Sequence, residues 1–152
     1  MPTRQGATIR FCASSNVVRF GDAGPSGPAE PVLEEPWHLS YPFILAHDGE
    51  VWMIPESSAN RSLTLYRADP FPTRWVPEAQ LLNDIEASDA TVVHRDGSFW
   101  MFAATRDGRG SWSDTLSIFH ARDLRGTWQP HQGNPILVDQ TAARPAGDIV
   151  ER

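Results

Sequence analysis

The chain has 152 residues, of which 40% are hydrophobic and 10% aromatic, and its formal net charge is -6 at pH 7. This length suits one domain with a core, and the aromatic content excludes disorder over most of it. The negative charge, without any arginine cluster, excludes nucleic acid as an expected partner, and no apolar run approaches the roughly 20 residues that span a bilayer.

Residues 1–37 are predicted to form an N-terminal segment and a linker. Arg4, Arg10 and Arg19 interrupt its first part, which therefore lacks the continuous apolar stretch of a signal peptide. We accordingly expect a cytoplasmic protein. Residues 21–36 are rich in proline and glycine, a composition that predicts a loop rather than a regular element.

After this linker the sequence repeats itself. The segment YPFILAHDGEVWMIPE, which begins at Tyr41, aligns without gaps on DATVVHRDGSFWMFAA, which begins at Asp89. In each copy an Asp-Gly pair stands between two apolar runs, which is a strong signal for a β-hairpin with a tight turn. Trp52 and Trp100 match in this alignment, and we expect both to lie in the core.

A second pair of segments extends each repeat. LTLYRADPFPTRW, from Leu63, aligns on LSIFHARDLRGTW, from Leu116. Each repeat therefore reads as a hairpin, a third strand, and a fourth strand around residues 81–82 or 136–137. The second copy is longer because of extra residues in the glycine-rich loop at 105–114.

Four short strands that recur every 50 or so residues, without helices between them, are typical of propeller blades. The predicted fold class is all-β: a partial β-propeller with about two full four-stranded blades, at 38–87 and 88–142, and the start of a third at 143. The N-terminal segment would then add the end of a preceding blade. A β-sandwich built from two similar sheets is the alternative. The chain is too short to close a ring of five blades, which needs roughly 240 residues.

Four strings in residues 30–152 carry a specific resemblance: HLSYPF from His38, IPESSANRSLTLYRA from Ile54, DAT from Asp89 and ARPAG from Ala143. They resemble the N-terminal five-bladed propeller domain of the glucosamine inositolphosphorylceramide transferase type and its bacterial relatives. That domain is in turn similar to the propeller glycosidases of the arabinanase and fructosidase superfamily. The resemblance implies a partial five-bladed propeller with a carbohydrate-related function.

The first strand of each blade lines the central channel of a propeller, so equivalent blade-start positions converge. Tyr41, Asp89 and Arg144 are three such positions. A carboxylate accepts hydrogen bonds from sugar hydroxyls, an aromatic ring covers an apolar sugar face, and arginine binds carboxylates and phosphates. The alternative is structural: Asp89 caps a turn and Arg144 pairs with it.

Glu56 replaces an apolar residue of the sister repeat, Ala104, so its carboxylate is not part of the blade scaffold. Glycoside hydrolysis needs two carboxyl groups, and Glu56 as acid with Asp89 as base or stabiliser are the catalytic candidates. A surface ion pair between Glu56 and Arg61 is the alternative.

The further substrate-binding candidates lie outside the matched hairpins. His38 precedes the first strand of the first repeat, Arg61 belongs to the PESSANRS string, and Trp112 lies in the longer loop as a stacking platform for a sugar. No metal site and no cofactor is expected.

These residues are compatible with two functions, and the sequence does not decide whether the protein is an enzyme. One is a glycosidase-like or glycosyltransferase-associated domain that acts on a glycan. The other is a non-catalytic glycan-recognition or accessory module, favoured because the Asp-Pro motif that opens the family's first blade has no counterpart here. A truncated remnant of a longer protein is a third reading. The expected partners are a glycan or sugar phosphate and, through blades that are not closed into a ring, a second copy of the chain.

Overall fold

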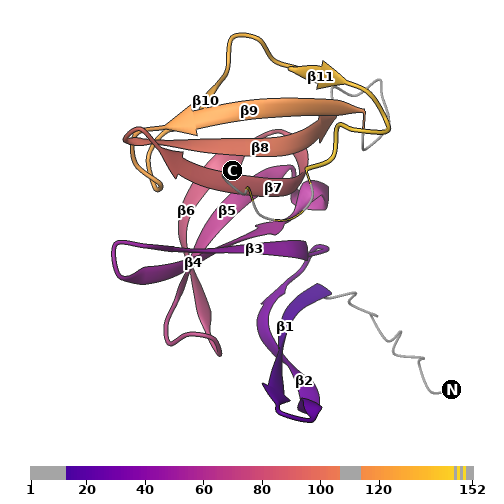
Figure 1. The fold of residues 1–152 in the computed structure, drawn as a ribbon, viewed down its shortest axis with the longest axis vertical. Coiled ribbons are helices and arrows are strands. Elements are labelled where there is room, and N and C mark those ends of the chain that lie inside the picture. The colour runs from indigo at the N-terminus through magenta and orange to yellow at the C-terminus, as the bar shows by residue number, and fades with distance from the viewer. Residues whose placement is uncertain (1–12, 107–113, 146, 148, 150–152) are drawn as a thin grey trace, which may run out of the picture.

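The computed structural model describes residues 13–106, 114–145, 147 and 149, which form strands and one 3-10 turn (Figure 1). The all-β class is confirmed. No helix in this described part is long and apolar enough to cross a membrane. The elements are β1 (Ala13–Gly21), β2 (Gly24–Glu35), β3 (Ser40–His47), β4 (Glu50–Glu56), η1 (Ser58–Asn60), β5 (Ser62–Ala68), β6 (Trp75–Asn83), β7 (Glu86–Arg95), β8 (Ser98–Arg106), β9 (Thr115–Ala121), β10 (Gln129–Pro130) and β11 (Leu137–Val138).

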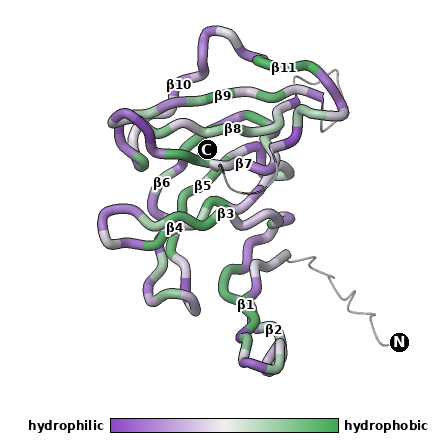
Figure 2. Tube along the Cα trace, in the orientation of Figure 1, coloured by the Kyte–Doolittle hydropathy of each residue, from purple (hydrophilic) through white to green (hydrophobic). Residues whose placement is uncertain are grey.

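Each sequence repeat forms its own antiparallel sheet. The first has the order β3-β4-β5-β6, and the second has the order β10-β9-β8-β7 with β11 also paired to β9. Both hairpins turn at the Asp-Gly pair, where Asp48 and Asp96 have φ of 51° and 52° and the glycines are also left-handed, as tight hairpin turns require. Hydrophobic residues lie along the strands and hydrophilic ones at the turns (Figure 2).

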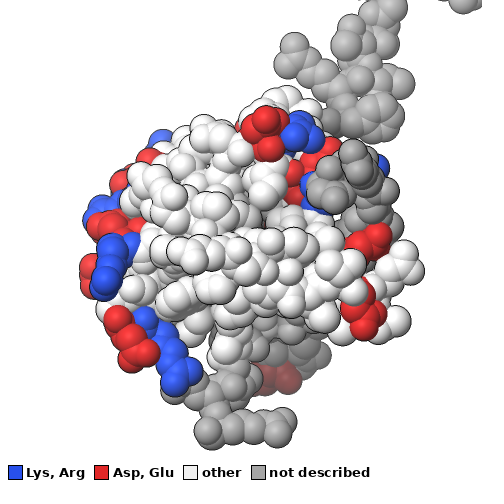
Figure 3. Space-filling view, turned by 90° about the horizontal axis from the view of Figure 1, so that it is seen from above, with Lys and Arg blue, Asp and Glu red and all other residues white. Residues whose placement is uncertain are grey.

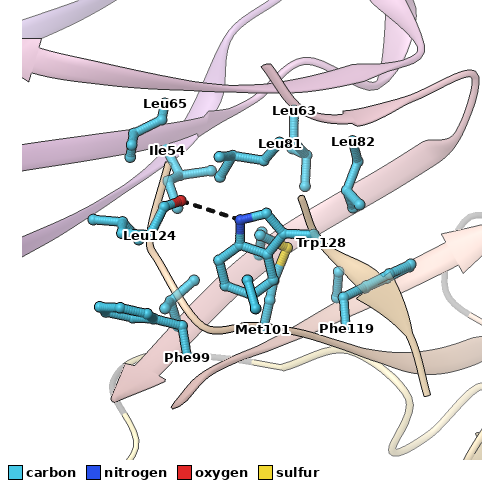
Figure 4. Close-up of a cluster of buried hydrophobic side chains, with 14 of the residues drawn as sticks. Ile54, Leu63, Leu65, Leu81, Leu82, Phe99, Met101, Phe119, Leu124 and Trp128 are labelled. Atoms are coloured by element: carbon cyan, nitrogen blue, oxygen red, sulfur yellow. Dashed lines mark hydrogen bonds between the residues drawn. The ribbon is translucent and has the colours of Figure 1, made fainter. Parts of the chain in front are cut away.

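The main core lies between the two sheets. Leucine and isoleucine side chains of the first sheet meet Phe99, Met101 and Phe119 of the second around the buried indole of Trp128 (Figure 4). The Trp128 indole N–H donates to the Leu124 carbonyl at 3.1 Å. One face of the first sheet thus packs on one face of the second, as neighbouring blades of a propeller do.

The two matched tryptophans differ in burial. Trp52 is 4% exposed and belongs to the core between the sheets, as predicted. Trp100 has the same register in its hairpin but is only half-buried and lies beside His120, with ring centroids 5.5 Å apart. The prediction that Trp100 is core is therefore wrong, because its face of the second sheet points away from the first sheet.

The N-terminal region also differs from the prediction. Residues 24–35 form β2, which pairs with β1 in an antiparallel ribbon with two register shifts, so a loop over 21–36 is wrong. Prolines are tolerated in such a ribbon because a two-stranded sheet leaves half of its N–H groups unpaired. The end of β2 contributes Leu33 to a second core cluster, which also contains Leu39, Met53, Tyr66 and Trp75.

The fourth strand of the second sheet is interrupted. β10 and β11 are two residues each, and both pair with β9, whereas β6 is continuous. Between them, the Asn134 side chain takes the place of a strand: its amide accepts from the Ile118 N–H at 2.8 Å and donates to the Ile118 carbonyl at 2.7 Å. The third blade predicted from 143 stays a prediction, since the described residues of 143–149 form no strand.

Candidate functional site

The starts of β3 and β7 share an unusual backbone geometry. Tyr41 has φ of 39° and Asp89 has φ of 53°, and each lies inside a register shift between the first and second strands of its sheet. A left-handed conformation is rare for residues other than glycine, although aspartate and asparagine adopt it more often than the others. Such positions cost of order 1–3 kcal/mol each and cluster at functional sites, and a bulge re-aims its side chain. The fold thus repeats an energetically unfavourable left-handed backbone at equivalent positions of the two sheets.

Asp89 forms an ion pair with Arg144, and two of the three guanidinium nitrogens, Nε and Nη2, contact the same oxygen, Oδ2. The Asp89 side chain is 9% exposed, whereas that of Arg144 is 51% exposed. Within the described residues, Oδ1 of Asp89 has no hydrogen-bond partner, yet it is not among the fully buried atoms. This oxygen is therefore an acceptor open to a bound hydroxyl group.

Tyr41 is held by the segment that carries Arg144. Its hydroxyl accepts from the Gly147 N–H at 2.9 Å and shares a 3.1 Å hydrogen bond with the hydroxyl of Thr91. Thr91 is 1% exposed. These contacts and the Asp89–Arg144 ion pair fasten Arg144 and Gly147 across the starts of β3 and β7. We call Tyr41, Asp89, Thr91, Arg144 and Gly147 the blade-start site.

Glu56 approaches the same end of the sheets through two serines. It ends β4 opposite Ser40, and the Ser58 hydroxyl lies 3.3 Å from its Oε1. The same hydroxyl lies 2.8 Å from the Ala87 carbonyl and 3.1 Å from the hydroxyl of Ser88, which precedes Asp89. Buried serines therefore connect Glu56 with Ser88, the residue before Asp89, across neighbouring sheets.

The remaining predicted residues do not join the blade-start site. Arg61 is paired with Asp84 and Glu86, at 2.9 Å each, and its hydrogen bond to Asp84 raises the pKa of its guanidinium. The alternative pairing of Arg61 with Glu56 is therefore wrong. His38 is exposed ahead of β3. Trp112 lies outside the described residues.

Charges elsewhere on the surface are mostly matched. Seen from above, side chains without charge form the middle of the surface, and the arginines that are visible lie beside carboxylates (Figure 3). Arg61, Glu86 and Arg106 form such a chain of ion pairs. The blade-start site differs from these surface pairs because its carboxylate is buried.

Sequence reasoning missed Thr91, Ser58 and Gly147. Each acts through contacts between segments far apart in the chain, and a lone hydroxyl or glycine carries no spacing signal. The DAT and ARPAG strings do contain Thr91 and Gly147, but their hydrogen bonds to Tyr41 depend on the return of the chain after residue 143. Chemically, the arrangement offers a fixed carboxylate acceptor, a half-exposed guanidinium and a second carboxylate nearby, a set that suits a polyhydroxylated ligand.

The sequence has relatives over most of its length. Residues 25–150 match the family described as "Glucosamine inositolphosphorylceramide transferase 1, N-terminal". The chain is 39% identical over 144 residues to glucosamine inositolphosphorylceramide transferase 1 of Arabidopsis thaliana, covering 87% of this chain and 19% of the relative. It is 40% identical over 106 residues to the protein of that name in Oryza sativa subsp. japonica, covering 68% of this chain and 14% of the relative. The chain thus spans less than a fifth of the length of these curated relatives.

Solved structures with a similar fold are more distant in sequence. An exo-beta-1,3-galactanase from Phanerochaete chrysosporium, determined with beta-1,3-galactotriose, superposes with a TM-score of 0.57 at 18% identity, over 78% of this chain and 28% of that one. An exo-beta-1,3-galactanase from Clostridium thermocellum superposes with a TM-score of 0.53 at 18% identity, over 62% of this chain and 21% of that one. At this identity the likeness concerns the fold.

Proposed function

Because the chain belongs to the family of glucosamine inositolphosphorylceramide transferase 1 N-terminal domains, we propose that it is a glycan-recognition segment of a β-propeller and binds its ligand at the blade-start site. The similar folds include an enzyme determined with a galactose oligosaccharide, which supports a carbohydrate as ligand. A glycan or sugar phosphate is the proposed class, and five blades is the proposed size of the complete ring.

One observation carries this proposal: the left-handed backbone at both Tyr41 and Asp89. A strained geometry that only stabilised a turn has no reason to recur with two different residues, one of which is a tyrosine. The two side chains share a use at the same end of the sheets, and Arg144 and Gly147 meet them there. The open oxygen of Asp89 then accepts from a sugar hydroxyl, while the guanidinium of Arg144 faces an anionic substituent.

The test compares two aspartates that share a left-handed backbone and a bond to an arginine. Asp84, like Asp89, is left-handed, with φ of 52°, and is bonded to an arginine, Arg61, but it is exposed and lies away from the site. Asparagine tolerates the left-handed conformation, so Asp89→Asn and Asp84→Asn remove only the charge.

We expect a glycan array to identify a ligand of the unmodified chain, and titration calorimetry to measure it. Loss of a charge-assisted contact costs about 1.5–3 kcal/mol, so Asp89→Asn should weaken binding by roughly ten- to a hundred-fold and Asp84→Asn should leave it unchanged. Equal affinities for the two variants, or no glycan bound by the unmodified chain, would contradict the proposal.

Hydrolysis is the second candidate, and the serine contacts that connect Glu56 with Ser88 favour it. In this scheme Glu56 donates a proton to the leaving group and Asp89 acts as base or stabiliser. Hydrolysis would be supported if the unmodified chain released product from β-1,3-galactotriose and the Glu56→Gln variant did not. Binding without turnover would leave recognition as the function.

A further inference from the structure

A hollow of about 370 Å³ lies on the face of the first sheet that points away from the second sheet. Its walls come from the end of β2, the residues before β3, the η1 turn and strands β5 and β6. None of its residues belongs to the blade-start site. The volume falls within the range of small-molecule pockets. The side chains that could contact a ligand there are those of Glu35, Trp37, Asn60, Thr64, Tyr66 and Gln80.

Trp37, which lines this hollow, carries an unmatched donor. The indole N–H of Trp37 is buried and has no hydrogen-bond acceptor within the described residues. Buried polar atoms in folded proteins nearly always have a partner, which can be a bound molecule. The Trp37 side chain itself is half-buried, so its ring both lines the hollow and offers apolar surface to an occupant.

A carboxylate acceptor is fixed in the same hollow. The Tyr66 hydroxyl, on a residue 3% exposed, donates to Oε1 of Glu35 at 2.8 Å. This bond holds Glu35 in place, while its second oxygen has no partner in the described part of the chain. The Asn60 amide donates to Ser62 at 2.9 Å, which orients its carbonyl oxygen as another acceptor.

We infer that this hollow is a second carbohydrate site, for an uncharged pyranose ring. A pyranose has an apolar face that stacks on an aromatic ring, and hydroxyls that pair with carboxylate and amide groups. The charged residues that line the hollow are two glutamates, Glu35 and Glu78, of which Glu78 is paired with Arg67 at 3.5 Å. The carboxylate of Glu35 therefore makes the hollow unfavourable for anionic sugars. This charge preference distinguishes it from the blade-start site, where Arg144 is available. The inference does not depend on the function proposed for that site.

The test measures binding of methyl β-D-galactopyranoside and of glucuronic acid to the full chain by saturation-transfer NMR and tryptophan fluorescence. We expect saturable binding of the neutral glycoside and much weaker binding of the acid. Gln80→Ala and Trp37→Phe each remove a hydrogen-bonding group, which should weaken binding about three- to tenfold. Gln129→Ala, which removes the same amide from an exposed position outside the hollow, should leave it unchanged.

A further variant separates the two sites. Asp89→Asn should leave binding of the neutral glycoside to the hollow unaffected, whatever it does at the blade-start site. Absence of saturable binding, or equal affinities for Gln80→Ala and Gln129→Ala, would overturn the inference. Loss of glycoside binding in Asp89→Asn together with full binding in Gln80→Ala would also overturn it, because the glycoside would then occupy the blade-start site.

Discussion

The buried hydroxyl of Tyr66 predicts how the stability of this fold responds to alkaline pH. Burial and the nearby carboxylate of Glu35 both raise the pKa of Tyr66 above the ordinary value of about 10. In the unfolded chain the tyrosine ionises near that ordinary value, while in the folded chain it stays protonated. Above about pH 10 the folded state therefore holds one proton more than the unfolded state.

The sign and size of the effect follow from this difference. The stability that the raised pKa of Tyr66 contributes is fully present below about pH 10 and is lost as the pH rises toward the pKa of the folded state. Above about pH 10 the free energy of unfolding should therefore fall by about 1.4 kcal/mol per pH unit. Few other groups interfere, because every basic side chain among the 13 is arginine and only two tyrosines are present. Arginine keeps its charge throughout this range.

Urea unfolding, followed by tryptophan fluorescence between about pH 8 and pH 11, measures the slope. Tyr66→Phe should be less stable at the low end by about 1.5–3 kcal/mol, the value of a hydrogen bond to a charged group, and should lose the alkaline slope. Tyr41→Phe serves as the matched control and should keep the slope that Tyr66 causes. Parallel profiles for the unmodified chain and Tyr66→Phe would refute this reasoning.

Three further expectations concern the blade-start site, the second sheet and the assembly state. Tyr41→Phe should lower the free energy of unfolding by about 1–3 kcal/mol, since it removes the hydrogen bonds to Thr91 and Gly147, and should hasten proteolysis after residue 143; unchanged proteolysis would contradict the fastening described above. Asn134→Ala should lower the free energy of unfolding in urea by a similar amount, because the Ile118 N–H loses its acceptor while the Ile118 carbonyl keeps the His131 N–H at 2.9 Å; an effect near zero would mean that water replaces the amide. We also propose that the half-buried face around Trp100 drives self-association, so sedimentation velocity should show dimers at micromolar concentration, and a monomer throughout would argue against it.

The sequence predicts the hairpins well because their cause is local. Alternating apolar residues and an Asp-Gly pair determine a tight turn whatever surrounds it, and both turns form at the expected residues. The burial of Trp100 could not be predicted in this way. Its neighbours along the chain match those of Trp52, but burial depends on which sheet covers its face.

The candidate site was predictable only in part, for a similar reason. The alignment of the repeats places Tyr41 and Asp89 at equivalent positions, and the structure brings Arg144 to Asp89. The left-handed backbone had no signal in the sequence, since tyrosine seldom adopts it. The β2 strand was missed because proline content alone does not distinguish a loop from an irregular two-stranded ribbon.

The Asn134 amide has a consequence for how this chain behaves among other copies of itself. An outer strand with free N–H and C=O groups is a template on which further chains add, and natural sheets avoid long edges of that kind. Here the peptide groups of Ile118 are occupied by a side chain, and the pairing strands on either side are only two residues long. The second sheet therefore ends in a short, broken border that offers an incoming strand no continuous ladder for cross-β growth.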